Sequence, residues 1–470
     1  MKKWTDMQRN ARYETYSSQT LATLQAQQAN SLWHLHYHLQ PKSGLMNDPN
    51  GFVYANNRWH LAYQNFPYGA VHGLKSWHEI SSDDLQHWQD DGVGLQPHAP
   101  YSTQGVYSGS AIAVGERCFL MYTGNVFTES GDRISTQLGA WVDADGTIDE
   151  LATPLISAPP TGYTQHFRDP QILHQNGRYY AILGAQRQDL RGTILIYSAK
   201  QPEGPWQFEG PLDFGYESLG YMIECPNLAF VDGKVALIFC PQGLEQSLLE
   251  YGNIHPNVYL LADAVDWDHH KLIRPGKLHN LDFGFDGYAA QVANAGTQGA
   301  RLISWLGLPD TTYPSDGEDW QGCLSLVREL HLQAGHLRQT PVVDALVGAV
   351  NSETHDKIDV ASVLHFEWPA DVEETLYLGN SQEGLELHLS PQALTIKRIE
   401  TSGVTATRHA TLLPEAHQAD LYLDASCFEL YLDEGTVVLS GRIFPSGDWY
   451  LSRPTQNQVQ VTSRAMATIF

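Results

Sequence analysis

Apolar and polar residues alternate over short stretches along most of the chain, and one arrangement recurs. An apolar run is followed by a polar pair and a second apolar run, as in GFVYANNRWHLAYQ, PQILHQNGRYYAILG and PNLAFVDGKVALIF. The pairs Asn176-Gly177 and Asp232-Gly233 tolerate the positive φ angles that a two-residue turn requires. The pattern therefore predicts a series of β-hairpins.

Five copies of this arrangement are recognisable. They start at residues 51, 109, 170, 225 and 287, so the steps between them are 55 to 62 residues. Each step has room for about four short strands and their loops, the content of one propeller blade. We therefore expect an all-β fold in which residues 33–332 form a five-bladed β-propeller.

The segments on either side of the repeats have other patterns. Residues 1–32 are rich in Gln, Ala and Thr, which predicts an N-terminal helical extension. In 333–357 the strand pattern lapses, so we expect a linker with a short helix in TPVVDALVGAVNS. Over 358–470 short alternating runs return without the repeat, which is typical of an antiparallel β-sandwich domain.

Three carboxylates occur in the first strands of three repeats. They are Asp48 in LMNDPNG, Asp169 in HFRDPQI and Glu224 in MIECPNL. The first strand of each propeller blade lines the central axis, so acids at matching positions converge on one channel mouth. A single acid of this kind would as readily cap a turn. Three in register predict an acidic pocket.

Such a pocket is suited to glycoside hydrolysis, in which one carboxylate is ionised and another carries a proton for the leaving oxygen. The polar neighbours of Asp48 favour its charged form. The apolar neighbours of Glu224 are expected to raise its pKa and keep it protonated. Arg168 precedes Asp169 directly, and we expect it to keep that third acid ionised.

Composition limits the partners and the compartment. Lys plus Arg number 28 against 53 Asp plus Glu, a formal net charge of −25, which argues against nucleic acid. The N-terminal lysines precede no apolar segment, and no run approaches the roughly 20 apolar residues that span a bilayer, so we expect no membrane partner. Five cysteines without C-x-x-C spacing indicate reduced thiols and a cytoplasmic location. The oligomeric state stays open.

The segment HLHYH, residues 34–38, alternates as a strand would and places three imidazoles on one face. No fourth ligand is evident, and the chain has no H-E-x-x-H motif. We therefore expect a polar strand face, with neither a metal nor a cofactor.

An ordered set of motifs, among them LMNDPNG, YQNFPYG, GVYSGSA, FRDP, ECPN and FDGYAAQ, resembles glycoside hydrolase family 32, the invertase and β-fructofuranosidase family. Within that family it is similar to the bacterial sucrose-6-phosphate hydrolases. The resemblance implies a five-bladed propeller with a C-terminal β-sandwich. It implies cleavage of the β-fructofuranosyl bond of sucrose 6-phosphate or sucrose with retention of configuration. Asp48 would be the nucleophile, Glu224 the general acid and then base, and Asp169 the transition-state stabiliser.

The resemblance also suggests substrate contacts. Many invertases have Trp where this chain has His72 in AVHGLKSW, and Lys75 in the same segment offers a point charge for phosphate. The alternative for Lys75 is a solvated loop residue. Leu45 and Met46, which lead into the first acid, are also expected at the site. The positions that resemble fructose-binding residues of the family are Asn47, Gln64, Tyr107, Ser108, Arg168 and Trp305.

Other functions remain open at this stage. The chain could be a fructan or fructooligosaccharide β-fructosidase, another five-bladed glycosidase such as an arabinan hydrolase, or a sugar-binding propeller without activity. Transfer of fructose to a sugar instead of water is likewise undecided.

Overall fold

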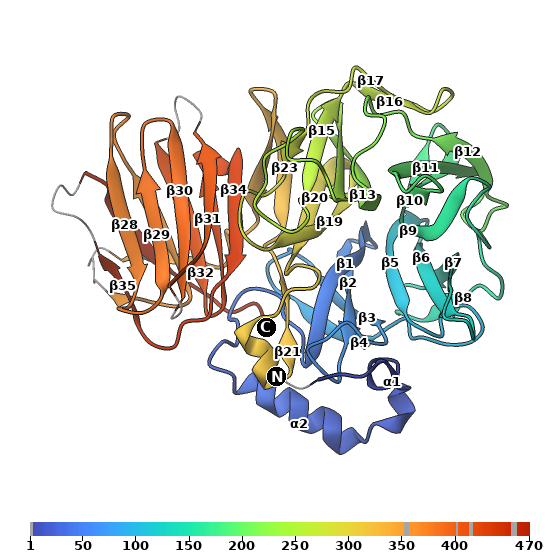
Figure 1. Cartoon of the computed structure of the whole chain (residues 1–470), viewed down its shortest axis with the longest axis horizontal. Coiled ribbons are helices and arrows are strands. Elements are labelled where there is room, and N and C mark those ends of the chain that lie inside the picture. Colours follow the sequence, from blue (N-terminus) through green and yellow to red (C-terminus); the bar gives the residue numbers. More distant parts are fainter. Residues whose placement is uncertain (1–2, 352–356, 401–402, 413–416, 453–457) are drawn as a thin grey trace.

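The computed structural model describes residues 3–351, 357–400, 403–412, 417–452 and 458–470. These residues form an all-β protein with a short helical segment at its N-terminus. Figure 1 shows two groups of sheets side by side, one built from β1–β24 and the other from β25–β36.

The N-terminal segment is helical, as the sequence predicts. It contains α1 (Asp6–Arg9), the 3-10 turn η1 (Tyr13–Thr15) and α2 (Ser18–Ala29). The side chains of Thr5 and Ser17 cap α1 and α2 by accepting hydrogen bonds from backbone N–H groups in the first turn of each helix. In the described ranges, no helix is both long and apolar enough to cross a membrane.

Within the described residues, five sheets of four or five strands follow one another along the chain. The first contains β1 (Gly44–Ala55), β2 (Arg58–Phe66), β3 (Ser76–Ser82), β4 (Gln89–Val93) and β21 (Trp320–Gln321), and the second β5 (Val106–Val114), β6 (Arg117–Phe127), β7 (Arg133–Val142) and β8 (Ile148–Glu150). The third contains β9 (Tyr163–Gln175), β10 (Arg178–Arg187), β11 (Gly192–Ala199) and β12 (Gln207–Pro211).

The fourth sheet contains β13 (Met222–Val231), β14 (Lys234–Gln242), β15 (Val258–Ala262) and β18 (His279–Asn280), beside a hairpin of β16 (Ala264–Asp266) and β17 (Lys271–Ile273). The fifth contains β19 (Gly287–Asn294), β20 (Ala300–Leu306), β22 (Cys323–Leu324), β23 (Arg328–Gln333) and β24 (His336–Pro341). Two further 3-10 turns are η2 (Gly296–Gln298) and η3 (Pro314–Glu318).

The first strands of the five sheets meet in a closed ring. β1 contacts β5, β5 contacts β9, β9 contacts β13, β13 contacts β19, and β19 contacts β1. β21 adds a parallel strand to β1, with Gly44 opposite Trp320. The sheets are therefore arranged around a common axis.

A ring of polar side chains, one on each of these five strands, links each strand to the next. Each side-chain oxygen accepts a hydrogen bond of 2.7–3.1 Å from a backbone N–H of the following strand. These N–H groups lie where neighbouring sheets diverge, and a buried N–H without a partner is destabilising. The acceptors of this polar ring are Asn50, Ser110, Gln171, Asn227 and Gln291, and their donors are Gly109, Ile172, Leu228, Val292 and Phe52.

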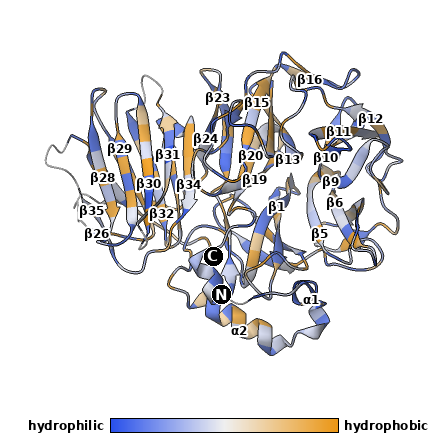
Figure 2. Ribbon diagram, in the orientation of Figure 1, coloured by the Kyte–Doolittle hydropathy of each residue, from blue (hydrophilic) through white to orange (hydrophobic). Residues whose placement is uncertain are grey.

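The C-terminal region is a pair of facing antiparallel sheets, as the sequence predicts for a sandwich. One sheet contains β25 (Val347–Asn351), β36 (Gln460–Met466), β27 (Ser362–Glu367), β32 (Gln418–Asp424), β33 (Cys427–Leu432) and β34 (Val437–Arg442), with η4 (Asp433–Gly435) between its last two strands. The other contains β26 (Lys357–Ile358), β35 (Trp449–Ser452), β28 (Glu374–Gly379), β29 (Gly384–Leu389), β30 (Ala393–Glu400) and β31 (Gly403–Thr411). Alternating positions of β28 and β29 are buried, and Figure 2 shows apolar stretches along these strands.

The prediction of a short helix in TPVVDALVGAVNS is wrong. β24 continues the fifth sheet to Pro341, and β25 begins at Val347 and pairs with β36. Val343 and Leu346, between the two strands, are buried in the core of the protein. Tertiary pairing therefore overrides the local pattern here. Residues 352–356 of the expected linker lie outside the described residues.

The prediction of a strand at HLHYH is also wrong, because residues 34–38 form an irregular segment. Asp424 of β32 accepts hydrogen bonds from the backbone N–H groups of His36, Tyr37 and His38, so these donors bond to a side chain instead of a strand. The His38 ring contacts Asp424 through Nδ1 at 3.0 Å and Glu429 through Nε2 at 3.1 Å. The segment therefore joins the ring of sheets to the sandwich.

His38 carries charge in this junction. Burial alone would lower its pKa, but its hydrogen bonds to Asp424 and Glu429 raise the pKa to about 10. His38, Asp424 and Cys427 lie close enough together to suggest metal ligands. Both ring nitrogens of His38 are already bound to carboxylates, so the histidine has no lone pair to offer a metal.

Candidate active site

Each of the five innermost strands has a β-bulge toward the same end. In each bulge two residues lie opposite one residue of the neighbouring strand, which breaks the alternation of side chains and aims one toward the axis. The bulged pairs are Asn47–Asp48, Tyr107–Ser108, Asp169–Pro170, Cys225–Pro226 and Ala289–Ala290.

The polar ring shows which positions of the five strands are equivalent. Two residues before its members stand Asp48, Ser108, Asp169, Cys225 and Ala289. Asp48 and Asp169 are therefore equivalent, as the sequence predicts. Glu224 lies one residue earlier than expected, because Cys225 occupies the matching position of β13. The backbone there has φ of +49° at Cys225, and +61° at the equivalent Asp169.

The three acids line one cavity of about 320 Å³ at the mouth of the ring. Most of the other residues predicted from the sequence line it too. Leu45 and Met46 do not: both side chains are fully buried, Leu45 against Phe66 and Leu74, and Met46 in the main core. The sequence-predicted residues in the cavity wall are Asn47, Asp48, Gln64, His72, Lys75, Tyr107, Ser108, Arg168, Asp169, Glu224 and Trp305.

Asp48 is held by three neutral donors. Asn47 Nδ2 donates to Oδ1 at 2.9 Å, and Ser108 Oγ donates to Oδ2 at 2.5 Å. Gln64 Nε2 lies 3.5 Å from Oδ2 and 2.5 Å from Ser108 Oγ. These donors fix the orientation of the carboxylate.

Glu224 has the strongest set of partners in the cavity. Arg168 donates to Oε1 from Nε at 3.1 Å and from Nη2 at 2.8 Å. Gln242 and Tyr288 each donate to Oε2 at 2.7 Å. Burial would raise the pKa of Glu224, but the charge of Arg168 and these hydrogen bonds lower it below the ordinary value. The raised pKa expected from its sequence neighbours is therefore wrong.

The pKa of Asp169 is shifted in the opposite direction from that of Glu224. Burial raises its pKa to about 7, against the lowering effect of Arg168, and the charges of Glu224 and Asp48 add to the increase. Arg168 Nε is 3.9 Å from Asp169 Oδ2, which instead accepts a hydrogen bond from the backbone N–H of Cys225 at 3.1 Å. The expectation that Arg168 keeps Asp169 ionised is therefore wrong, because the guanidinium is bound to Glu224.

Aromatic side chains form another wall. Trp305 is almost fully buried, and the His72 ring packs against its edge at 6.0 Å between centroids. Burial, together with the charges of Lys75 and Arg9, holds the pKa of His72 well below its usual value. His72 is therefore neutral at physiological pH.

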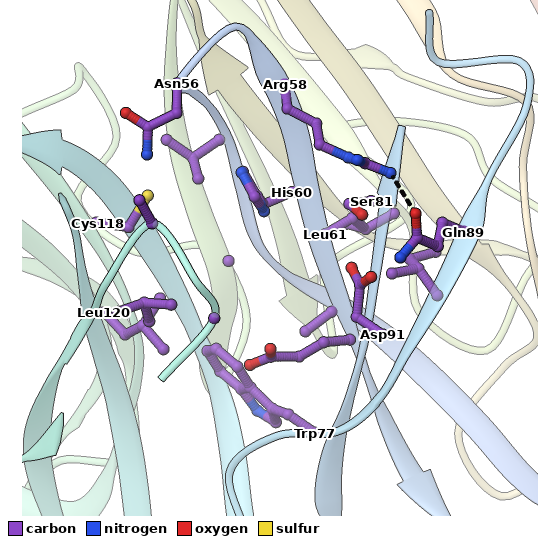
Figure 3. Close-up of a pocket in the computed structure, with 18 of the residues that line it drawn as sticks. Asn56, Arg58, His60, Leu61, Trp77, Ser81, Gln89, Asp91, Cys118 and Leu120 are labelled. Carbon is purple, nitrogen blue, oxygen red and sulfur yellow. Dashed lines mark hydrogen bonds between the residues drawn. The ribbon is translucent and has the colours of Figure 1, made fainter. Parts of the chain in front are cut away.

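A second cavity, of about 500 Å³, lies beside the first sheet and contains none of the three acids. Figure 3 shows it lined by His60, Trp77 and Asp91, with Arg58 donating to Gln89 across its edge. Asn56, in the turn that ends β1, also lines it, so it opens toward the other end of the strand from Asp48.

The cavity wall also contains residues that were not expected from the sequence, among them Arg9, Arg133, Gln242 and Tyr288. Tyr288 could have been found from the repeat, because it stands three residues before Gln291 as Glu224 does before Asn227. Arg9 has no such signal, because it precedes the repeats.

The chain matches the model of the glycosyl hydrolases family 32 N-terminal domain over residues 38–341. The protein belongs to this family of glycosidases. The matched range contains the ring of sheets and all three acids.

Curated relatives agree with this assignment. The chain is 42% identical to a sucrose-6-phosphate hydrolase of Pediococcus pentosaceus, over 94% of this chain and 92% of the relative. It is 40% identical to a sucrose-6-phosphate hydrolase of Streptococcus mutans, over 93% and 94% of the two chains.

Solved structures agree as well. The fold is similar to sucrose-6-phosphate hydrolase from Lactobacillus gasseri, with a TM-score of 0.93, 36% identity and 100% of both chains covered. It is also similar to a β-fructofuranosidase of Bombyx mori, solved as a mutant in complex with sucrose, with a TM-score of 0.86, 27% identity, and 97% and 99% of the chains covered.

Proposed function

We propose that this protein hydrolyses the β-fructofuranosyl bond of sucrose 6-phosphate, releasing fructose and glucose 6-phosphate, and that sucrose is its second substrate. The observation that carries the proposal is the convergence of Asp48, Asp169 and Glu224 in one cavity of a family 32 glycosidase. The relatives named sucrose-6-phosphate hydrolases support the phosphorylated substrate.

The roles of the acids are those that the similarity to family 32 implies. Asp48, held by Asn47 and Ser108, attacks the anomeric carbon of the fructosyl group, and Glu224 gives a proton to the glycosidic oxygen as that bond breaks. The hexose leaves with this proton, and a fructosyl ester forms on Asp48. Glu224, now ionised, takes a proton from water, which attacks the ester and frees Asp48. The two displacements retain configuration.

Asp169 is the transition-state stabiliser in this scheme, since its carboxyl can accept or donate hydrogen bonds to fructosyl hydroxyls. Because the pKa of Asp169 is raised to about 7 and that of Glu224 is lowered, Asp169 binds a proton before Glu224 as the pH falls in the substrate-free site. Catalysis requires a proton on Glu224, so substrate binding must weaken the hold of Arg168 or Tyr288 on that carboxylate. Gln64, Tyr107 and Trp305 complete the fructosyl pocket.

We propose the following domain organisation. The five sheets around the axis are the blades of a five-bladed propeller, which follows the helical extension of residues 1–32. We propose two boundaries that differ from those expected: the last blade ends at 341 instead of 332, because β24 extends the fifth sheet, and the sandwich begins at 347 instead of 358, because β25 pairs with β36. All five cysteines are free and buried, which supports a cytoplasmic location.

The test is release of fructose from sucrose 6-phosphate, sucrose and 1-kestose by the purified protein. We expect the highest kcat/KM for sucrose 6-phosphate and a lower one for sucrose. Activity confined to 1-kestose would indicate a fructooligosaccharide hydrolase instead. No release from any of the three, by a protein that is folded by circular dichroism, would indicate a binding protein.

A further inference from the structure

Three basic side chains line the active-site cavity without an acidic partner: Arg9, Lys75 and Arg133. In the part of the chain that the structure describes, none of the three makes a side-chain hydrogen bond or ion pair. The third arginine of the wall, Arg168, is bound to Glu224. In a chain of net charge −25, three unpaired cations in one cavity need an explanation.

Two of these cations share one aromatic ring. Lys75 Nζ lies 5.5 Å and Arg133 Cζ 5.8 Å from the centroid of the Tyr107 ring. The ring face attracts each cation by a modest amount, about 0.5–2 kcal/mol. It does not neutralise either charge, and the two cations repel each other. An anion between them would relieve this repulsion.

Lys75 is built into the cavity wall and is not a solvated loop residue. Only 5% of its surface is exposed, and its backbone carbonyl accepts a hydrogen bond from Val106 N–H at 2.9 Å. Burial lowers the pKa of Lys75 to about 8, although Asp48, Glu224 and Asp169 oppose the shift. The ammonium is therefore partly desolvated in the unliganded site, a state that a bound anion stabilises.

Arg9 reaches the same cavity from the N-terminal segment. It is the last residue of α1, and its carbonyl accepts a hydrogen bond from Leu74 N–H at 2.7 Å. A Cβ on Gly73 would lie 2.9 Å from that carbonyl oxygen, so the close approach depends on glycine. Tyr13 OH donates to the Leu74 carbonyl at 2.6 Å, and the Trp4 ring packs on Phe66. Figure 1 shows α1 beside the sheet of β1–β4, to which this loop belongs.

We propose that Arg9, Lys75 and Arg133 form an anion site for the phosphate of a phosphorylated disaccharide, so that the N-terminal segment is part of the substrate pocket. This inference rests on the proposed function. Guanidinium groups donate paired hydrogen bonds to phosphate oxygens, and an ammonium adds a compact charge. A phosphate monoester carries a charge of about −1.5 to −2 near pH 7, which three cations can match.

The proposed substrate also says which part of the pocket these cations serve. In sucrose 6-phosphate the phosphate is on the leaving hexose, so we expect Arg9, Lys75 and Arg133 to face that hexose and not the fructosyl group. The overall negative charge of the protein acts only weakly at this site, because salt screens charges beyond about 8 Å.

The experiment compares Arg9→Gln and Arg133→Gln with Arg12→Gln, an exposed arginine a few residues further along that does not line the cavity. We expect the ratio of kcat/KM for sucrose 6-phosphate to kcat/KM for sucrose to fall about tenfold in each of the first two, the loss of one hydrogen bond to a charged group. Arg12→Gln should leave the ratio at the wild-type value. Arg9→Lys, which keeps the positive charge, should show a smaller fall in this ratio than Arg9→Gln.

A binding measurement separates this inference from the proposed function. By titration calorimetry, the wild-type protein should bind glucose 6-phosphate more tightly than glucose, and Arg9→Gln and Arg133→Gln should remove most of the difference. Equal binding of the two hexoses by the wild-type protein would overturn the anion site. So would an unchanged ratio in both variants, even if sucrose is hydrolysed normally. Selective glucose 6-phosphate binding without hydrolysis would support the site and refute the proposed activity.

Discussion

The guanidinium of Arg168 lies 2.8 Å from Glu224 Oε1, across the contact between β9 and β13. Asp169, its neighbour in the sequence, is 3.9 Å away. The packing of two successive sheets therefore decides which acid is paired with the arginine. It also reverses the order of proton affinities that the sequence neighbours of these acids suggest.

Replacing Asp48 by Asn should reduce kcat for sucrose by roughly 10⁴-fold or more, the scale of loss when a catalytic nucleophile is removed. The amide keeps the shape of the side chain but does not form the fructosyl ester. A fructose-release assay checks this, with Asp83→Asn as the matched control because Asp83 is largely exposed and outside the cavity. Activity within tenfold of the wild type would contradict the nucleophile assignment.

Replacing Tyr288 by Phe should shift the alkaline limb of the pH profile of kcat/KM to higher pH. The Tyr288 hydroxyl donates to Glu224 Oε2 at 2.7 Å and lowers the pKa of that acid, so its loss raises the pKa and keeps Glu224 protonated further into alkaline solution. Tyr122→Phe is the control, since its hydroxyl contacts Glu150, outside the cavity. A shift to lower pH would refute the role given to this hydrogen bond.

Replacing Gln291 by Ala should destabilise the protein by about 1–3 kcal/mol, the effect of leaving a buried hydrogen-bonding group unpaired. Gln291 accepts from Phe52 N–H at 2.8 Å and donates to the Gly109 carbonyl at 2.7 Å, so it links three innermost strands. Urea unfolding measures the change. Gln298→Ala, at an exposed position of η2, should be close to neutral. Equal stability of the two variants would show that the polar ring does not stabilise the fold.

Replacing His38 by Gln should destabilise the junction with the sandwich by about 3–5 kcal/mol, as expected when one member of a buried ionic cluster is removed. The cluster includes His36, Asp424, Glu429 and Arg328. The pKa of His38 is raised from 6.5 to about 10, so its charge contributes full stability below pH 6.5 and loses it as the pH rises to about 10.

The measurement for His38 is the difference in unfolding free energy between the wild type and His38→Gln at pH 6 and at pH 9. The difference should be smaller at pH 9. His269→Gln, whose side chain is 72% exposed, should show little change at either pH. A difference that grows toward pH 9 would mean that His38 is neutral in the folded protein.

Much of the site follows from repetition along the sequence. The hairpin pattern locates the innermost strands, and the acids on them meet because equivalent residues of a radial repeat face one axis. The same repeat could have revealed the polar ring, since Asn50, Gln171 and Asn227 each follow a proline after an acid-bearing segment. The one-residue displacement of Glu224 depends on where β13 bulges, and local sequence does not determine that.

The remainder of the site depends on contacts between distant segments. Arg9 enters the cavity only because α1 packs on the loop that ends in Leu74, and neither segment carries a repeat. The irregular course of residues 34–38 depends on Asp424, which lies nearly 390 residues further along the chain. Propensity and alternation describe local preference, and buried polar partners of this kind override it.

The pairing of β1 with β21 has a consequence for how the protein is made. β1, which carries Asp48, has an open edge until Trp320 and Gln321 emerge from the ribosome and pair with Gly44 and Leu45. The backbone N–H of Phe52 likewise has no acceptor until Gln291 has been synthesised. A nascent chain therefore exposes the strand that carries Asp48 until the first 321 residues have been synthesised, and during that time the edge is open to pairing with other chains.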